Sequence, residues 1–286
     1  MSPLSDQSVA RLRQALEEPE LAGTRYELLA PLGRGGMGSV YRVRDRELGR
    51  ELALKVLTVE GGARAVERLR AEARILAGLE HPGIVPVHDA GLLADGRPYY
   101  AMKLVRGVRL DVFARSNPGR SALLRAFESL CEAVAFAHER GVWHRDLKPD
   151  NVMVGDFGEV LVLDWGVGEV GTPGFMAPEQ TSGAAVDQRS DVHGLGRILE
   201  TLLAPDPPRA LLAIARKAAA PDPAARYASV RELSQDVARF RDGEAVLAHA
   251  ESLLERGERV VRRNPALFAL ISTYAVVRTL LLLLVR

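Results

Sequence analysis

Glycines early in the chain have the spacing of a phosphate-binding hairpin. Residues 33–40 read GRGGMGSV, a GxGxxGxV pattern between two runs that are typical of strands. Glycine lets a hairpin backbone lie close to phosphate oxygens and offer N–H donors to them. The residues that such a hairpin would place at a phosphate-containing ligand are Gly33, Arg34, Gly35, Gly36, Met37, Gly38 and Val40. A hairpin without ligand is the alternative, and a dinucleotide-binding fold is disfavoured because a strand, not a helix, follows.

A lysine and a glutamate farther along could complete such a site. Lys55 lies on the third predicted strand, and Glu72 lies on the helix predicted after it. A phosphate-binding lysine needs an acid to hold its ammonium in place. A surface lysine with a solvated glutamate is the ordinary alternative. However, the 38 lysine and arginine residues include only four lysines, so a lysine here indicates a need for a compact point charge.

Three further motifs follow in order along the chain. Residues 144–151 read HRDLKPDN, residues 164–166 read DWG and residues 177–179 read APE. Together with the glycine-rich segment and Lys55, these motifs resemble the catalytic loop, metal-binding turn and activation-segment end of protein kinases. The resemblance is to the eukaryotic-like (Hanks-type) serine/threonine protein kinases of bacteria, over about residues 25–243. The whole set is far more specific than any one motif.

By this resemblance, residues in the later motifs have defined roles. Asp146 would orient the attacking hydroxyl and accept its proton, and Lys148 would stabilise the transferring phosphoryl group. Asn151 and Asp164 would bind Mg²⁺ that bridges the ATP phosphates. Thr172 would hydrogen-bond the catalytic aspartate. ATP and Mg²⁺ are therefore the expected cofactors, and proteins with serine or threonine are the expected substrates.

The resemblance also assigns the nucleotide pocket and its supports. Lys55, paired with Glu72, would hold the α- and β-phosphates. The apolar residues expected around adenine are Val40, Ala53 and Met153, with Met102 at the gatekeeper position and Lys103 to Val105 as the hinge. The residues expected to support the site are Asp191 beneath the catalytic loop, Arg226 as the partner of Glu179, and Trp165 in an apolar slot. For a single charged residue, a solvated position is the usual alternative.

Two regions are shorter than the resemblance leads one to expect. Only ten residues, VGEVGTPGFM, lie between Gly166 and Ala177, and Thr172 is their only hydroxyl side chain. Regulation by activation-loop phosphorylation is therefore not expected. The second short region, 200–212, predicts a reduced groove for peptide substrates. The expected function is a serine/threonine protein kinase, and the alternatives are an ATP-binding pseudokinase-like scaffold or a kinase of small molecules.

The elements that must position these residues follow from hydrophobic periodicity. The pattern predicts three strands within 26–59, a helix at 63–79, strands within 84–93 and 98–105, a helix at 121–140, short strands at 151–154 and 160–164, and helices within 187–240. The expected fold class is α+β, and the resemblance implies a two-lobed protein kinase fold with a small β-rich N-lobe containing one helix and a larger, mostly helical C-lobe, plus a C-terminal apolar helix. The expected divisions are a helical extension at 1–24, the N-lobe at 25–105, the C-lobe at 106–243, a basic helix at 244–264 and an apolar tail at 265–286. Cys131 falls on an apolar helix stripe, which predicts a core position.

The net charge and the C-terminal residues predict the partners and the cellular location of the protein. A net charge of +1 gives no field that favours nucleic acid, so none is expected as a partner. The stretch 265–285 carries one charge, Arg278, and is long enough to cross a bilayer as a helix. Arg259, Arg262 and Arg263 precede it, which predicts a cytoplasmic kinase domain tethered to the inner membrane. A buried or dimerising apolar helix is the alternative.

Overall fold

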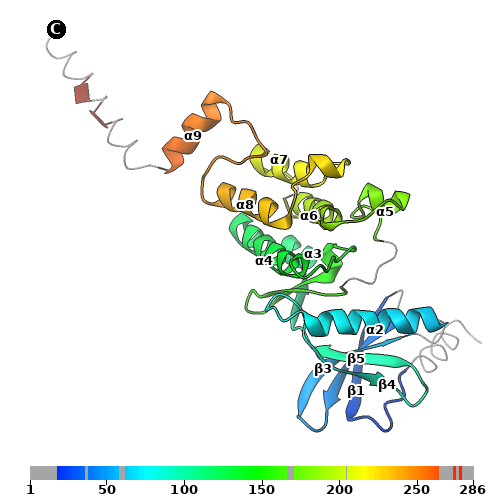
Figure 1. The fold of residues 1–286 in the computed structure, drawn as a ribbon. Helices are drawn as coiled ribbons and strands as arrows, with labels where there is room; N and C mark the ends of the chain where they lie inside the picture. Colours follow the sequence, from blue (N-terminus) through cyan, green and yellow to red (C-terminus); the bar gives the residue numbers. More distant parts are fainter. Residues whose placement is uncertain are drawn as a thin grey trace, which may run out of the picture.

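The computed structural model describes residues 18–35, 38–57, 62–165, 171–203, 205–263, 273–274 and 277–278. Within these residues the chain forms a sheet lobe and a helical lobe, which Figure 1 shows one below the other. The sheet lobe consists of β1 (Tyr26–Gly35), β2 (Gly38–Asp45), β3 (Arg50–Leu57), β4 (Val87–Leu92), β5 (Pro98–Lys103) and the helix α2 (Gly62–Gly78). Its five antiparallel strands have the order β1-β2-β3-β5-β4, and α2 lies across the sheet.

Alternation along β3 and β5 decides which side chains face α2. Side chains of successive strand residues point to opposite faces of a sheet. The cluster that includes α2 takes Ala53, Leu57, Tyr100 and Met102 from these strands. The cluster on the other face takes Leu52, Leu54, Val56, Tyr99 and Ala101. Lys55 has the same parity as Ala53 and Leu57, so the fold turns its side chain toward α2.

The helical lobe packs around one long helix. Its helices are α3 (Leu110–Arg115), α4 (Arg120–His138), α5 (Pro178–Ser182), α6 (Gln188–Leu203), α7 (Arg209–Ala218), α8 (Val230–Arg241) and α9 (Leu253–Arg263), with short turns η2 (Pro149–Asn151) and η3 (Pro223–Ala225). A three-stranded sheet of order β6-β7-β8 consists of β6 (Gly107–Arg109), β7 (Val152–Gly155) and β8 (Val160–Val162). On α4, the fully buried stripe includes Cys131, as predicted, and burial raises the pKa of its thiol.

Most of the predicted elements are confirmed. The helices expected at 63–79 and 121–140 are α2 and α4, displaced by one or two residues at their ends. The strand expected within 84–93 begins only at Val87, and Ile84 instead makes an isolated bridge to Val162. The short elements β6, α3 and α5 were not predicted, because three to six residues are too few to show a period.

The basic helix predicted at 244–264 is wrong in its first half. Gly243 has a φ of 70° and follows the end of α8. The next residues form a loop, whose Leu247 and Ala248 donate backbone N–H groups to the buried carboxylate of Asp236 at 2.6 and 2.9 Å. The helix begins only at Leu253 because Ser252 and Glu255 form a reciprocal capping box.

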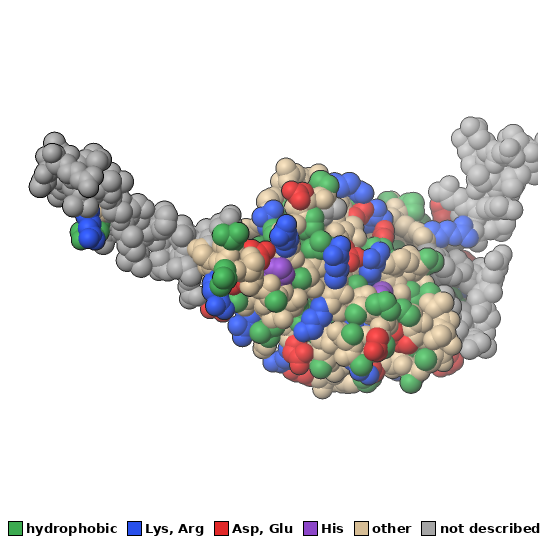
Figure 2. Space-filling view, turned by 90° about the horizontal axis from the view of Figure 1, so that it is seen from above, with side chains coloured by type: hydrophobic (Ala, Val, Ile, Leu, Met, Phe, Trp, Pro, Cys, Tyr) green, Lys and Arg blue, Asp and Glu red, His purple; other side chains and the backbone are tan. Residues whose placement is uncertain are grey.

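Two predictions concern segments mostly outside the described residues. The helix expected within 1–24 falls largely on residues 1–17, which are not described, and only residues 273–274 and 277–278 of the tail 265–286 are described. Among the described residues, no helix combines the length and apolar character needed to cross a bilayer. On the face seen in Figure 2, basic, acidic and apolar side chains of the described residues are interspersed, in agreement with the small net charge.

Candidate functional site

A buried ion-pair group joins the two lobes. The ammonium of Lys55 lies 2.8 Å from Oε1 and 3.0 Å from Oε2 of Glu72, and 2.8 Å from Oδ1 of Asp164. Lys55 comes from β3, Glu72 from α2 and Asp164 from the turn after β8. Lys55 and Glu72 are buried, whereas the side chain of Asp164 is half exposed. The pairing of Lys55 with Glu72 that the sequence predicts is present, and Asp164 shares the same ammonium.

Burial and charge act in opposite directions on these groups. Burial lowers the pKa of Lys55, but the surrounding Tyr100, Asp164 and Glu72 outweigh it and raise that pKa well above its ordinary value. For the half-exposed Asp164, partial burial raises the pKa, but Lys55 outweighs this effect and the pKa lies below the ordinary value. For Glu72, burial prevails over Lys55 and Tyr100, so its pKa is raised. Lys55 is therefore held in its charged form, ready to meet anionic groups.

A second group gathers around Asp146. The backbone N–H and the hydroxyl of Thr172 both donate to Oδ1 of Asp146, each at 2.8 Å. Lys148 lies 2.9 Å from Oδ2 of Asp146 and donates to the Thr172 hydroxyl at 2.5 Å. The side-chain amide of Asn151 donates to the backbone oxygen of Asp146 at 2.9 Å and to its Oδ2 at 3.3 Å. The fold thus brings together these four predicted residues.

One buried carboxylate fixes the backbone of this loop. Asp191, on α6, accepts the N–H of His144 at 2.8 Å and that of Arg145 at 2.8 Å, and it also contacts His138 at 2.7 Å. Arg145 has a φ of 67°, a conformation that non-glycine residues rarely adopt without outside support. The support that the sequence assigns to Asp191 is therefore confirmed. Burial works against the charge of Asp191, yet His138 and the backbone donors lower its pKa.

His144 and Asn151 connect the two groups. Nε2 of His144 donates to the backbone oxygen of Leu163 at 2.8 Å, and Leu163 donates its N–H to the backbone oxygen of Asn151 at 2.9 Å. The next residue, Asp164, has a φ of 56°. Trp165 is fully buried, with its ring 4.9 Å from that of His144, which confirms the predicted apolar slot. These contacts on both sides hold Asp164 in its uncommon backbone conformation.

The glycine-rich segment forms the β1–β2 hairpin. Gly33 pairs with Val40, Arg34 with Ser39 and Gly35 with Gly38, while the predicted Gly36 and Met37 lie outside the described residues. A Cβ on Gly38 would lie 2.2 Å from the backbone oxygen of Val56, so packing against β3 requires glycine there. A Cβ on Gly33 would meet no described protein atom.

The residues predicted around adenine lie on neighbouring strands. Ala53 pairs with Met102 across β3 and β5, and both are buried. Val40 on β2 and Met153 on β7 are half-buried. The side chain of Lys103 is exposed, and its N–H donates to the backbone oxygen of Pro86 at 3.1 Å. Val105 follows β5, and its N–H donates to no acceptor within the described part of the chain.

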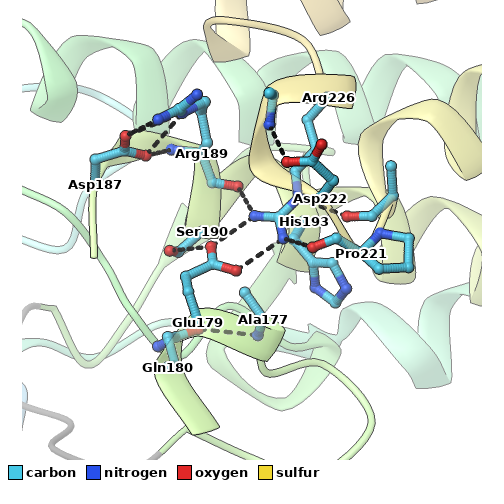
Figure 3. A network of polar contacts seen from close by, with 12 residues as sticks. Ala177, Glu179, Gln180, Asp187, Arg189, Ser190, His193, Pro221, Asp222 and Arg226 are labelled. Carbon is cyan, nitrogen blue, oxygen red and sulfur yellow. Dashed lines mark hydrogen bonds and ion pairs between the residues drawn. The ribbon is translucent and has the colours of Figure 1, made fainter. Parts of the chain in front are cut away.

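A third polar network anchors the end of the activation segment (Figure 3). Arg226 donates to Glu179 through Nη1 at 2.6 Å and Nη2 at 2.8 Å, and Ser190 donates to the same carboxylate at 2.7 Å. The guanidinium also donates to three backbone oxygens. Its side chain is fully buried, so the predicted pairing with Glu179 is confirmed. Burial alone would raise the pKa of Glu179, but Arg226 and Ser190 lower it to about 2.

Sequence reasoning missed two polar side chains at the site. Tyr100 donates its hydroxyl to Oε1 of Glu72 at 2.9 Å from a buried position on β5. His138, at the end of α4, contacts Asp191 at 2.7 Å. Each lies within an apolar run, where the sequence gives no signal that a polar atom has a partner.

The chain matches the protein kinase domain family over residues 26–220. It is 32% identical over 300 residues to the serine/threonine-protein kinase PknD of Chlamydia muridarum, covering 77% of this chain and 32% of that protein. It is 40% identical over 206 residues to the DNA damage-responsive serine/threonine-protein kinase RqkA of Deinococcus radiodurans, covering 66% of this chain and 31% of that protein. The crystal structure of the Mycobacterium tuberculosis PknI kinase domain is similar with a TM-score of 0.64 and 28% identity, covering 78% of this chain and 98% of that one. The chain spans about a third of the length of these two curated relatives.

Proposed function

The chain belongs to the protein kinase family, among the eukaryotic-like serine/threonine kinases of bacteria, and from this premise we propose that it transfers the γ-phosphate of ATP to serine and threonine hydroxyls of proteins. The observation that carries the proposal is the convergence around Asp146. A carboxylate, a lysine and a threonine hydroxyl meet there within hydrogen-bonding distance.

Asp146 is the proposed catalytic base. Its carboxylate orients the substrate hydroxyl and accepts its proton as phosphorus–oxygen bond formation proceeds. Lys148, 2.9 Å away, places a positive charge where the transferring phosphoryl group gains negative charge. Thr172 fixes the rotamer of Asp146 through two hydrogen bonds to one oxygen. In phosphoryl transfer the protein contributes mainly by positioning the reactants and neutralising charge, and little by covalent chemistry.

Asn151 and Asp164 fit the role of magnesium ligands. Mg²⁺ prefers oxygen ligands and is usually held by one or two protein side chains together with substrate phosphates. Asp164 is half exposed, and its Oδ2 accepts no hydrogen bond from the described residues. The side-chain amide nitrogen of Asn151 donates hydrogen bonds to Asp146, so its side-chain oxygen is left to bind a cation. When bound, Mg²⁺ would neutralise phosphate charge and polarise the phosphoryl group.

The nucleotide would lie under the β1–β2 hairpin. Lys55, held charged between Glu72 and Asp164, would anchor the α- and β-phosphates. Gly33 leaves space where a side chain would project, which supports a close approach of phosphate to the hairpin. The adenine would pack against Val40, Ala53 and Met153 behind Met102, with the backbone from Lys103 to Val105 at its polar edge.

We infer that activity needs no activation-loop phosphate. Residues 166–170 contain no serine, threonine or tyrosine. The hydroxyl of Thr172 is bonded to Asp146 and Lys148, so a phosphate on it would bring negative charge against the catalytic carboxylate. The trimmed segment 200–212 supports a small peptide groove, since α6 ends at Leu203 and α7 already begins at Arg209.

Transfer of labelled γ-phosphate tests the function. The wild-type chain is expected to phosphorylate itself or a generic basic protein, and Asp146→Asn is expected to abolish transfer while ATP binding persists. Asp150→Asn is the matched control, because Asp150 lies in the same loop but is half exposed and pairs with Arg109. Wild-type chain that binds ATP without transferring phosphate would instead support a nucleotide-binding scaffold. Transfer to metabolites alone would support a small-molecule kinase.

We also propose that the tail tethers the kinase to the inner membrane. Support comes from the single charge in 265–285, from the arginines before it, and from Leu253 and Leu254, which are 86% and 84% exposed at the start of α9. The full chain is expected to fractionate with membranes and require detergent for extraction, and deletion of 265–286 is expected to release it. A full chain that fractionates without membranes contradicts this part.

A further inference from the structure

We propose that Tyr100 is a positioning residue that holds Glu72 of α2 against Lys55 and so keeps the nucleotide-binding lysine in place. The inference rests on the proposed kinase function, because it assigns a role within the same site. Tyr100 is not part of the glycine-rich, lysine or aspartate motifs, and it lies on β5, the strand next to that of Lys55.

One side chain contacts both members of the ion pair. Tyr100 on β5 lies directly opposite Lys55 on β3, and both side chains face α2. The phenol hydroxyl donates to Oε1 of Glu72 at 2.9 Å. The centre of the ring lies 5.7 Å from the ammonium of Lys55, within the range of a cation–π contact. The ring therefore acts on the lysine, and the hydroxyl acts on the glutamate.

Because Glu72 is fully buried, its carboxylate depends on the hydrogen bond from the Tyr100 hydroxyl. Glu72 has no exposed surface, so its carboxylate must find its donors within the protein. Lys55 divides its ammonium between Glu72 and Asp164, both at 2.8 Å. The Tyr100 hydroxyl serves Glu72 alone. With Lys55 also bound to phosphate oxygens, the Tyr100 hydroxyl would remain a donor that Glu72 shares with no other acceptor, and it would help to keep the Glu72 carboxylate, and with it α2, at the sheet.

This contact suits a chain without a phosphorylation switch. Residues 166–170 carry no hydroxyl side chain, and the hydroxyl of Thr172 is engaged with Asp146. The contacts that reach the Glu72 carboxylate come from the sheet, from Lys55 and Tyr100. Hence α2 is held in its working position by the fold itself, before any nucleotide binds.

Tyr100→Phe is the test variant, because it keeps the ring and removes only the hydroxyl. Tyr99→Phe is the matched control: Tyr99 is the preceding residue, is nearly buried, faces the opposite cluster, and its hydroxyl makes no hydrogen bond within the described residues. Initial rates are measured against ATP and against a basic protein substrate. Tyr100→Phe is expected to lower kcat/KM for ATP by about tenfold with the KM for protein unchanged, and Tyr99→Phe to change neither.

A double-mutant cycle separates positioning from general weakening of the fold. In a Glu72→Ala background, Tyr100→Phe is expected to lower the rate by less than about twofold, because the acceptor of its hydroxyl has been removed. Hydrogen exchange of the unliganded chain is expected to quicken in α2 and not in β3. Equal behaviour of the Tyr100 and Tyr99 variants, or fully additive losses with Glu72→Ala, would overturn the proposal.

Nucleotide binding distinguishes a failure of the proposed kinase function from a failure of the role proposed for Tyr100. If the wild type binds a fluorescent ATP analogue but transfers no phosphate, the proposed activity is wrong. The affinities of Tyr100→Phe and Tyr99→Phe for the analogue then decide the role of Tyr100. A loss of affinity confined to Tyr100→Phe supports the role, and equal affinities refute it.

Discussion

Thr172 donates two hydrogen bonds to a single oxygen of Asp146: its backbone N–H and its hydroxyl both lie 2.8 Å from Oδ1. The other carboxylate oxygen faces Lys148 and the amide of Asn151. Each oxygen of the proposed base thus has its own partners, which fixes the orientation of the carboxylate. The short activation segment contributes to the site through the one hydroxyl it retains.

Removal of the Thr172 hydroxyl should therefore slow transfer without preventing nucleotide binding. In Thr172→Ala, Asp146 keeps the backbone donor but loses the second, and Lys148 loses an acceptor at 2.5 Å. We expect kcat to fall by about tenfold to a hundredfold, with the KM for ATP within about twofold. Thr172→Ser restores the hydroxyl and should recover most of the rate. Steady-state kinetics of the three proteins check this, and equal kcat for alanine and wild type would contradict it.

Dephosphorylated protein should be fully active. Because residues 166–170 offer no phosphoacceptor and Thr172 is bound to Asp146, phosphatase treatment is expected to leave the initial rate within about twofold. Thr172→Glu should be inactive, since a second carboxylate would lie beside Asp146. Intact mass and initial rates are measured before and after treatment. A large drop in rate that tracks loss of phosphate from the segment would refute independence from phosphorylation.

The sequence predicts the motif residues of the site and several of its supports, but not every contact between distant segments. HRDLKPDN ends at the start of β7 and DWG follows the end of β8, and the antiparallel pairing of Val152 with Val162 brings the two motifs side by side. The hydrogen bond of Tyr100 could not be predicted, because only the pairing of β3 with β5 brings it opposite Lys55. The loop before α9 was likewise missed, since its cause is the remote carboxylate of Asp236. Hydrophobic periodicity does not predict contacts between segments that are distant in the sequence.

Arginine should not replace Lys55. The ammonium lies between two carboxylates at 2.8 Å and under the ring of Tyr100, in a site only 6% exposed. A planar guanidinium is larger and would overpack this space while keeping the charge. We expect Lys55→Arg to lower kcat/KM for ATP by about a hundredfold. The control is Lys217→Arg, because Lys217 lies over the ring of Tyr227 in the helical lobe and an arginine can stack there too. Comparable kinetics for the two variants would contradict the requirement for lysine.

The Glu179–Arg226 pair should govern stability rather than nucleotide binding. Arg226→Gln leaves the carboxylate of Glu179 buried without its cation, and removal of one partner of a buried pair costs on the order of 3 kcal/mol. Arg231→Gln is the control, because the pair of Arg231 with Glu139 is exposed and is expected to contribute less than about 1 kcal/mol. Urea unfolding at neutral pH measures both.

The pH dependence of this pair has a definite sign. Burial would raise the pKa of Glu179, but Arg226 and Ser190 hold it at about 2, below the ordinary 4.5. A group whose pKa is lower in the folded state contributes its full stability above the unfolded pKa and loses it as pH falls toward the folded pKa. The free energy of unfolding should therefore differ most between wild type and Arg226→Gln above pH 4.5, and the difference should shrink between pH 4.5 and 2. A difference that stays constant across this window would mean that charge pairing is not what Arg226 contributes.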